Sequence, residues 1–351
     1  PNIQGNEWKY IKDCLDTEWV SSAGKYVKLF EKKIAEYVQV KHAIACVNGT
    51  SALQVSLKLA DVSAGDEVIV PTITFIAPIN AIAYNGASPI FMDSDKFYNI
   101  DSEKTIDFIK NHTIYNNGFT YNKETKNKIS GIIPVHIWGN ACDIYELINL
   151  CKERSISVIE DASESLGTVY NSGKYKGRHT GSLGTIGCLS FNGNKIITSG
   201  GGGMILTNND EIAEKAKYLT TQAKDDLINF VHNEIGYNYR LTNIQAALGL
   251  AQLEQLSGFL AKKKKIYTIN IMDKMFQIFL LGINNKTRTH YISLSTKISD
   301  IYNHINTKYN ISTDYFYLIH STKILDNKNM SNITINEFNL KYDTESYKIG
   351  N

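Results

Sequence analysis

The sequence predicts an α/β fold with a mostly parallel sheet over roughly its first 210 residues, because strand-like and helix-like segments alternate there. Short apolar runs of strand length occur at 43–47, 67–71, 131–136 and 156–160, and helical patterns lie between them. The chain has 351 residues, of which 43% are hydrophobic, so it can form one large or two unequal domains. We expect a sheet covered by helices on both faces.

The first elements follow this alternation. Apolar residues recur at helical spacing over 27–37, and the run at 43–47 has the length and composition of a buried strand. The next helix is marked by Leu53 and Leu57. The segment 67–71 then reads as a strand that ends at its proline.

The second half of the predicted sheet is interrupted by a polar stretch. Residues 101–130 lack periodicity and are interpreted as a surface excursion before the next strand. Buried strands follow at 131–136 and 156–160, separated by a helix at about 143–154. Beyond Arg240 the apolar spacing predicts one long helix.

The C-terminal third differs in composition. After residue 270 the chain becomes rich in Ile, Asn, Lys, Thr and Tyr. We expect a large domain over 1–241 and a smaller α+β domain over 242–351.

Charge and cysteine content narrow the class of protein. The net charge is +2, which gives no general case for a nucleic-acid or membrane partner. No apolar stretch approaches the roughly 20 residues of a membrane span, and the first ten residues lack the apolar segment of a signal peptide. The five cysteines are scattered and form no C-x-x-C pair, so neither a disulfide framework nor a metal site is expected. A cytoplasmic location fits.

The most informative residues surround a lysine. Lys195 lies on a short turn before the glycine run 200–203, and Asp161 lies upstream at the end of a predicted strand. A pyridoxal phosphate (PLP) site needs a lysine that forms a Schiff base with the cofactor aldehyde. It also needs an acid that keeps the pyridine nitrogen protonated. The glycine run would let the backbone approach a ligand closely.

A second motif suits the cofactor phosphate. The segment 48–53 runs from a strand into a helix, with Gly49 at the turn and hydroxyls on Thr50 and Ser51 at the helix start. Backbone amides and the helix dipole favour a phosphate at such a position. Judged alone, these residues would be an ordinary helix cap. Together with Lys195 and Asp161 they favour a phosphate site.

Several longer motifs occur in a fixed order. They lie at 19–24, 48–53, 71–77, 160–167, around Lys195, and at 236–249. With these motifs the chain resembles the DegT/StrS family of PLP-dependent nucleotide-sugar aminotransferases along about residues 5–255. The resemblance implies the aspartate aminotransferase-like fold, fold type I. It also implies pyridoxal 5′-phosphate as cofactor, with pyridoxamine phosphate as an intermediate.

The resemblance also implies roles for residues around the cofactor ring. Lys195 would be the Schiff-base lysine and Asp161 the partner of the pyridinium nitrogen. Phe75 would stack on the ring. Glu164, at a place often held by glutamine, would lie near the cofactor hydroxyl.

The phosphate would have partners from two subunits. Thr50, Ser51 and Ser190 would bind it from one subunit, and Asn238 would reach it from the other. The resemblance therefore implies a homodimer with shared active sites.

Four further residues are candidate substrate contacts: Trp19, Asn192, Arg240 and His320. A guanidinium group pairs well with phosphate oxygens, which supports Arg240. Many family members have His-Pro where this chain has Asn192-Gly193. The version found here resembles the branch that aminates C4 of 4-keto-6-deoxy sugars, and Lys195 argues against the dehydratase branch.

The predicted reaction moves an amino group from L-glutamate to C4 of a 4-keto-6-deoxy nucleotide sugar. The product would be a 4-amino-4,6-dideoxy nucleotide sugar of the viosamine or perosamine type, for glycan biosynthesis. A 3-keto sugar aminotransferase, an amino-acid aminotransferase and a non-catalytic, ligand-responsive regulator on the same fold remain alternatives. UDP, dTDP and GDP stay open as the nucleotide.

Overall fold

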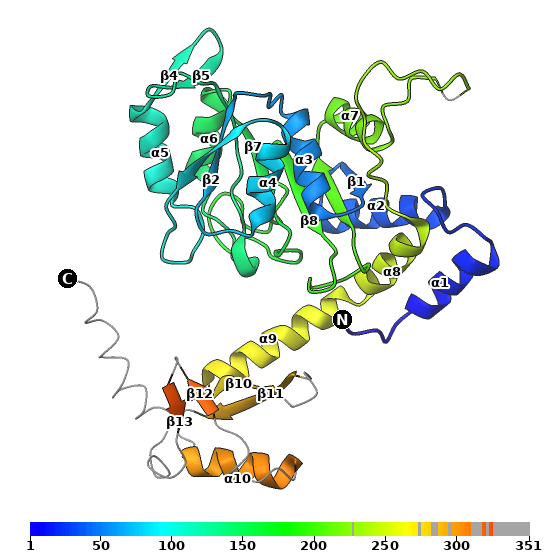
Figure 1. Cartoon of the computed structure of the whole chain (residues 1–351), viewed down its shortest axis with the longest axis vertical. Helices are drawn as coiled ribbons and strands as arrows, with labels where there is room; N and C mark the ends of the chain where they lie inside the picture. The colour runs from blue at the N-terminus through cyan, green and yellow to red at the C-terminus, as the bar shows by residue number, and fades with distance from the viewer. Residues whose placement is uncertain are drawn as a thin grey trace. The chain divides into compact units, whose positions relative to one another are not determined.

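The computed structural model describes residues 1–226, 228–272, 275–281, 287–293, 297–309, 318–320 and 323–325 (Figure 1). The chain divides into two compact units, 1–259 and 260–351. The sequence placed this division at residue 241. The difference comes from α8 (Asn243–Glu254), which packs against α1 (Glu7–Asp16) and α2 (Lys25–Val38).

Two buried amides, Asn243 and Gln252, tie α8 to the N-terminal segment. Gln252 donates to the carbonyl of Asn2 at 2.8 Å and to Glu7 Oε1 at 2.6 Å. The side chain of Asn243 donates to the carbonyl of Trp19 at 2.7 Å, and its oxygen accepts the N–H of Tyr26 at 3.0 Å. Asn243 is buried, so separating these partners would leave polar groups without hydrogen bonds. The helix therefore belongs with the N-terminal helices.

The first unit contains a seven-stranded sheet in the order β1-β9-β8-β7-β6-β2-β3. All neighbouring pairs are parallel except those of β9, which runs antiparallel to both β1 and β8. This topology is that of fold type I and confirms the predicted α/β class. The strands are β1 (His42–Cys46), β2 (Glu67–Pro71), β3 (Ser88–Met92), β6 (Ile129–Ile132), β7 (Ser157–Asp161), β8 (Ile186–Ser190) and β9 (Gly203–Thr207).

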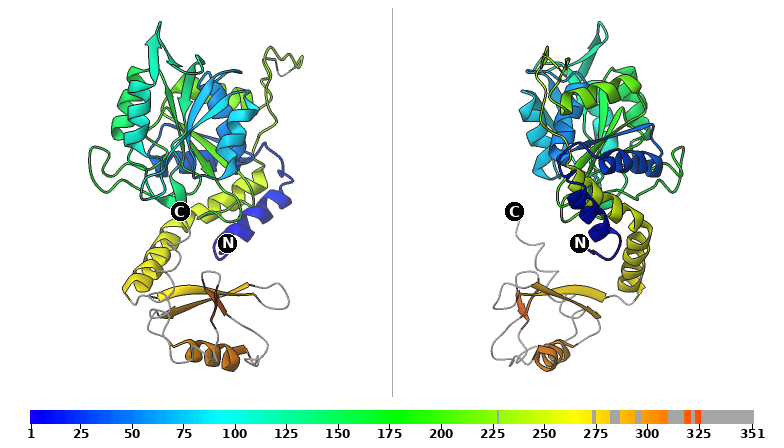
Figure 2. Two further views of the ribbon diagram at one scale, coloured as in Figure 1. Left: turned by 60° about the vertical axis from the view of Figure 1, so that its left-hand side comes forward. Right: turned by 90° about the vertical axis from the view of Figure 1, so that its right-hand side faces the viewer.

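Helices cover both faces of the sheet (Figures 1 and 2). In β2, Val68 and Val70 point into the core formed with α3 and α7, whereas Ile69 points into the core formed with α5 and α6. Alternate residues of a strand point to opposite faces, so both faces of β2 are buried. The helices that follow α2 are α3 (Gly49–Leu59), α4 (Ile76–Tyr84), α5 (Ser102–Asn111), α6 (Tyr145–Glu153) and α7 (Asp210–Thr220).

Two sequence predictions about regular structure were wrong. The stretch 101–130, interpreted as a surface excursion, contains regular structure: α5, an antiparallel pair of β4 (Thr113–Asn116) and β5 (Phe119–Asn122), and the first half of β6, a strand that the sequence placed at 131–136. Helix α5 buries Ile109 fully and packs Ile106 and Phe108 against the same core, which also contains Leu147 and Leu150 of α6. The predicted single helix beyond Arg240 is instead α8 followed by α9 (Leu256–Met272).

In the part that the structure describes, the second unit contains antiparallel strand pairs, most of α9 and one further helix. Strand β10 (Met275–Leu281) pairs with β11 (Thr287–Ser293), and β12 (Leu318–His320) pairs with β13 (Lys323–Leu325). Helix α10 spans Ile298–Tyr309. In the part of the chain that the structure describes, no helix is long and apolar enough to cross a bilayer.

Candidate active site

The carboxyl ends of three strands bring the predicted site residues to one edge of the sheet. Strand β7 ends at Asp161, β8 ends at Ser190, and β1 leads directly into α3 at Gly49. These three strands run in the same direction, because β9 is antiparallel to both β1 and β8. In open α/β sheets, ligands bind at the carboxyl ends of parallel strands.

The start of α3 forms the predicted phosphate cup. Asn48 caps the helix, and its side-chain oxygen accepts the N–H of Ser51 at 2.8 Å. A Cβ atom on Gly49 would lie only 2.9 Å from Ser190 Cβ and 3.4 Å from Ser163 Oγ. The first amides of a helix have no partner within it, so the positive end of α3 meets two serine side chains. This arrangement suits a phosphate.

Ser163 is a residue of this cup to which the sequence assigned no role. It follows Asp161 by two positions, inside the motif 160–167. Its backbone N–H donates to Asp161 Oδ1 at 3.0 Å, while its hydroxyl faces Gly49. Ser163 therefore joins the phosphate end of the site to the acid.

The surroundings of Asp161 suit a partner for a cationic ring nitrogen. Only 5% of the residue is exposed, and burial raises the pKa of its carboxyl group, while hydrogen bonds from Ser163 partly offset that effect. The charge of Lys195 also lowers the Asp161 pKa, which shows that the two groups share one electrostatic environment. A buried carboxylate of this kind gains most when a cation comes beside it.

Lys195 is held by a short turn and by Glu164. Its N–H donates to the carbonyl of Asn192 at 3.1 Å, and its Nζ lies 3.2 Å from Glu164 Oε1. The lysine side chain is 15% exposed, so its amine is sheltered without being sealed from ligands. The other oxygen of Glu164 accepts the N–H of Trp138 at 3.0 Å.

Trp138 is a second neighbour that the sequence did not single out. Its backbone has φ 52° and ψ 20°, a left-handed conformation that is costly for a bulky residue. Its side chain is 67% exposed and contacts Tyr98. Positive φ values are not visible in a sequence, so nothing in the residue pattern could have indicated this position.

The remaining predicted residues lie at the surface. Phe75 caps α4 after the carboxyl end of β2, and 77% of it is exposed, so its ring is available to a ligand. Arg240 donates to the side chains of Asn238 and Gln222, each at 3.3 Å, which brings two predicted residues together. Asn238, Arg240 and Asn192 are exposed.

Trp19 and His320 complete the predicted set. Trp19 is 58% exposed, and its carbonyl is bound by Asn243. His320 is the last residue of β12, and its side chain lies outside the described part of the chain.

The family of the chain follows from a comparison with known families. Residues 1–336 match the model of the DegT/DnrJ/EryC1/StrS aminotransferase family. The chain belongs to this family. It is therefore a transaminase, and PLP is its cofactor.

Named relatives include several GDP-perosamine synthases. The protein of that name from Caulobacter vibrioides is 42% identical over 267 residues, which cover 76% of this chain and 66% of that protein. The chain thus spans just under two thirds of that relative. The GDP-perosamine synthase of Escherichia coli O157:H7 is 36% identical over 343 residues, which cover 93% of this chain and 86% of that protein.

Solved structures of the family agree with the fold. PseC of Helicobacter pylori, an aminotransferase of pseudoaminic acid biosynthesis, matches with a TM-score of 0.67 and 27% identity. The match covers 80% of this chain and 71% of that one. A family aminotransferase from Brucella abortus matches with a TM-score of 0.69 and 26% identity over 91% of this chain and 82% of that one.

Proposed function

We propose that this transaminase moves an amino group from L-glutamate to C4 of a 4-keto-6-deoxy nucleotide sugar. The product would be a 4-amino-4,6-dideoxy nucleotide sugar for glycan biosynthesis. The observation that carries the proposal is the convergence of Lys195, Asp161 and the α3 phosphate cup at one sheet edge. The relatives named GDP-perosamine synthase support the C4 position and make GDP the first nucleotide to test.

The proposed division of labour follows from the geometry. Bound PLP supplies an electron-accepting ring that stabilises negative charge on the carbon beside the transferred nitrogen. Lys195 Nζ would take a proton from the donor and return one to the sugar, because a sheltered amine beside the reacting carbon can act first as base and then as acid. The buried carboxylate of Asp161 would hold the ring nitrogen in its protonated form.

Binding of the cofactor is proposed to use both ends of the site. The amides at the start of α3, with Thr50, Ser51 and the hydroxyls of Ser163 and Ser190, would hold the phosphate. The exposed ring of Phe75 would cover the cofactor ring. Glu164 would lie near the cofactor hydroxyl, because it already contacts Lys195.

We further propose that a homodimer completes the site. Asn238 and Arg240 are exposed and joined by a hydrogen bond, so they can act together on phosphate groups. Asn238 would reach the cofactor phosphate of the partner subunit, and Arg240 would pair with the diphosphate of the nucleotide sugar. Trp19, Asn192 and His320 remain the other proposed sugar-nucleotide contacts.

Two alternatives each have one relative in their favour. A 3-keto substrate is suggested by UDP-2-acetamido-2-deoxy-3-oxo-D-glucuronate aminotransferase of Pseudomonas aeruginosa, 32% identical over 270 residues. A regulatory role is suggested by a pleiotropic regulatory protein of Geobacillus stearothermophilus, 35% identical over 244 residues. The intact lysine and acid favour catalysis over regulation.

The test follows the visible absorption of the purified protein loaded with PLP. We expect L-glutamate to bleach the band and a 4-keto-6-deoxy GDP-sugar to restore it. Restoration only by a 3-keto sugar would move the reaction to C3, and a band that glutamate leaves unchanged would exclude glutamate as donor.

The matched variant is Lys195→Ala. It should fold as the wild type does but lose turnover, because no other amine in the proposed mechanism moves the proton. Full turnover by this variant would remove Lys195 from the mechanism.

A further inference from the structure

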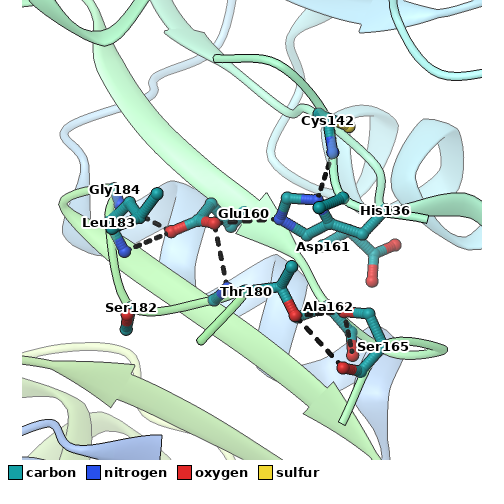
Figure 3. Close-up of polar contacts among 12 residues, drawn as sticks. His136, Cys142, Glu160, Asp161, Ala162, Ser165, Thr180, Ser182, Leu183 and Gly184 are labelled. Carbon is teal, nitrogen blue, oxygen red and sulfur yellow. Dashed lines mark hydrogen bonds and ion pairs between the residues drawn. The ribbon is translucent and has the colours of Figure 1, made fainter. Parts of the chain in front are cut away.

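The fully buried carboxylate of Glu160 precedes Asp161 in β7 and has no part in the mechanism described so far. Its Oε1 accepts the N–H groups of Leu183 and Gly184, both at 2.6 Å. Its Oε2 accepts the N–H of Gly181 at 2.9 Å and lies 2.9 Å from His136 Nε2 (Figure 3). Four donors thus surround one carboxylate that has no exposed surface.

These contacts define the charge on both side chains. Burial alone would raise the pKa of Glu160, but the hydrogen bonds from His136 and the backbone amides hold it below its ordinary value. The N–H of Cys142 donates to His136 Nδ1 at 3.1 Å, so Nδ1 carries no proton. The Nε2–H of His136 therefore donates to an ionised Glu160. Burial alone would lower the pKa of the imidazole, but its contacts with Cys142 and Glu160 raise it to about 10.

The pair is linked to Asp161 through the main chain. The N–H of His136 donates to the carbonyl of Asp161 at 3.0 Å, and the N–H of Asp161 donates to the carbonyl of Pro134 at 2.9 Å. Glu160 and Asp161 are neighbours in the chain, so the His136 ring, the Glu160 carboxylate and the Asp161 carbonyl form a closed ring of bonds. Both backbone polar groups of Asp161 are fixed by the segment that carries His136.

The side chain of Asp161 depends on this backbone. Its carboxylate accepts hydrogen bonds from Ser163, two residues further along. Because the Asp161 carboxylate is fixed by a residue of its own segment, its direction follows the backbone of that segment. Adjacent side chains of a strand lie on opposite faces, so Glu160 secures β7 from the side away from the proposed cofactor.

We propose that Glu160 and His136 are positioning residues that fix the Asp161 carboxylate at the pyridine nitrogen of the cofactor. The inference rests on the proposed role of Asp161. The buried Glu160–His136 pair would align the Asp161 carboxylate, which must lie within about 0.5 Å of its productive position.

The geometry predicts different effects for two histidine variants. A glutamine amide can place its N–H near the position of Nε2, whereas an asparagine amide reaches only the position of Nδ1. His136→Gln therefore keeps the donor to Glu160, and His136→Asn loses it. Glu160→Gln replaces one acceptor by an amide nitrogen that faces other N–H groups. His136 cannot compensate by moving its proton to Nδ1, because Cys142 donates there.

Thr180→Val supplies the matched control. The Thr180 hydroxyl is buried beside the same turn and donates to Ser165 Oγ at 2.8 Å, but none of its hydrogen bonds reaches Glu160 or His136 (Figure 3). Its loss should lower the melting temperature of the apoprotein without changing the site.

The experiment measures the dissociation constant of PLP from each full-length apoprotein and the absorption maximum of the loaded protein. We expect Glu160→Gln and His136→Asn to weaken PLP binding by about tenfold or more and to shift the maximum. His136→Gln and Thr180→Val should bind within about threefold of the wild type.

Equal PLP binding by His136→Asn and His136→Gln would overturn the proposal, and so would a Thr180→Val protein as weakened as His136→Asn. The comparison of the two histidine variants decides the matter even if Glu160→Gln does not fold. No sugar substrate is present in these measurements. A failure of the proposed sugar reaction therefore leaves this result interpretable, and the reverse also holds.

Discussion

Replacing Gly203 by alanine tests whether the glycine run shapes the phosphate cup. Gly203 is the first residue of β9 and pairs with Cys46 at the end of β1. A Cβ atom there would lie 2.4 Å from the carbonyl oxygen of Asn48 and 2.7 Å from the N of Gly49. Both contacts are with backbone, so no side-chain rotation can relieve them.

The size of the effect follows from these distances. A carbon–oxygen contact of this type needs about 3.3 Å, so 2.4 Å must grow by roughly 0.9 Å. Forcing an extra methyl group into a packed site costs about 1–3 kcal/mol of folding free energy. For a unit of this size, each kcal/mol lowers the melting temperature by about 2–4 °C. We therefore expect a fall of roughly 2–12 °C in the apoprotein.

The same displacement should reach the cofactor. The atoms that must move belong to Asn48 and Gly49, at the start of α3, so the amides proposed to bind the phosphate move with them. A shift approaching 1 Å in a positioned group can cost about 100-fold in function. PLP affinity, measured by absorbance titration, should therefore fall together with stability.

Gly193→Ala is the control, because a Cβ atom at Gly193 meets no atom within 4 Å and its backbone is not in the left-handed region. It should melt and bind PLP as the wild type does. Suppose that Gly203→Ala also melts within about a degree of the wild type and binds PLP equally well. That result would show that the close packing of β9 against the start of α3 affects neither stability nor PLP binding.

Two further predictions concern stability. Burial raises the Asp161 pKa above its ordinary value of 3.8, so the folded apoprotein loses stability as the pH rises from 3.8 through that raised pKa. Without PLP at pH 7.5, Asp161→Asn should therefore have a higher melting temperature than the wild type, and the difference should shrink toward pH 4. Its turnover should be lost. An equal or lower melting temperature at pH 7.5 would contradict the burial argument. Thr242 caps α8 and exchanges hydrogen bonds with Gln245 in a capping box, so Thr242→Ala should cost about 1 kcal/mol in chemical denaturation. A change below the error of that measurement would show that the capping box adds nothing measurable to the stability of α8.

The parts of the fold that could be predicted were those with continuous local patterns. Strands β1, β2 and β7 lie within one residue of their predicted ranges, because each is built around a short run of apolar residues. Helix α5 was missed although Ile106, Phe108 and Ile109 pack against the core, because these few apolar residues lie within a long polar stretch. The break between α8 and α9 was missed because Gln255 ends α8 without glycine or proline.

The candidate site shows a similar division. Lys195, Asp161 and the start of α3 could be indicated from sequence, since each residue type has a specific chemical use at a strand end. The contacts that complete the site join distant segments: Glu164 with Trp138, and Glu160 with His136. These depend on backbone conformations and on register between strands, which no local pattern encodes.

The position of β9 has a consequence for synthesis of the chain. Among the described residues, strand β1 lies at one end of the sheet and pairs with β9 alone. Cys46 can therefore pair with its partner Gly203 only after Gly203 has been synthesised. At about 5–20 residues per second, a ribosome needs roughly ten to thirty seconds to make the intervening chain. During that interval the nascent protein carries an unpaired, apolar strand. Its cofactor pocket is therefore assembled late, by a strand that arrives after most of the sheet has been translated.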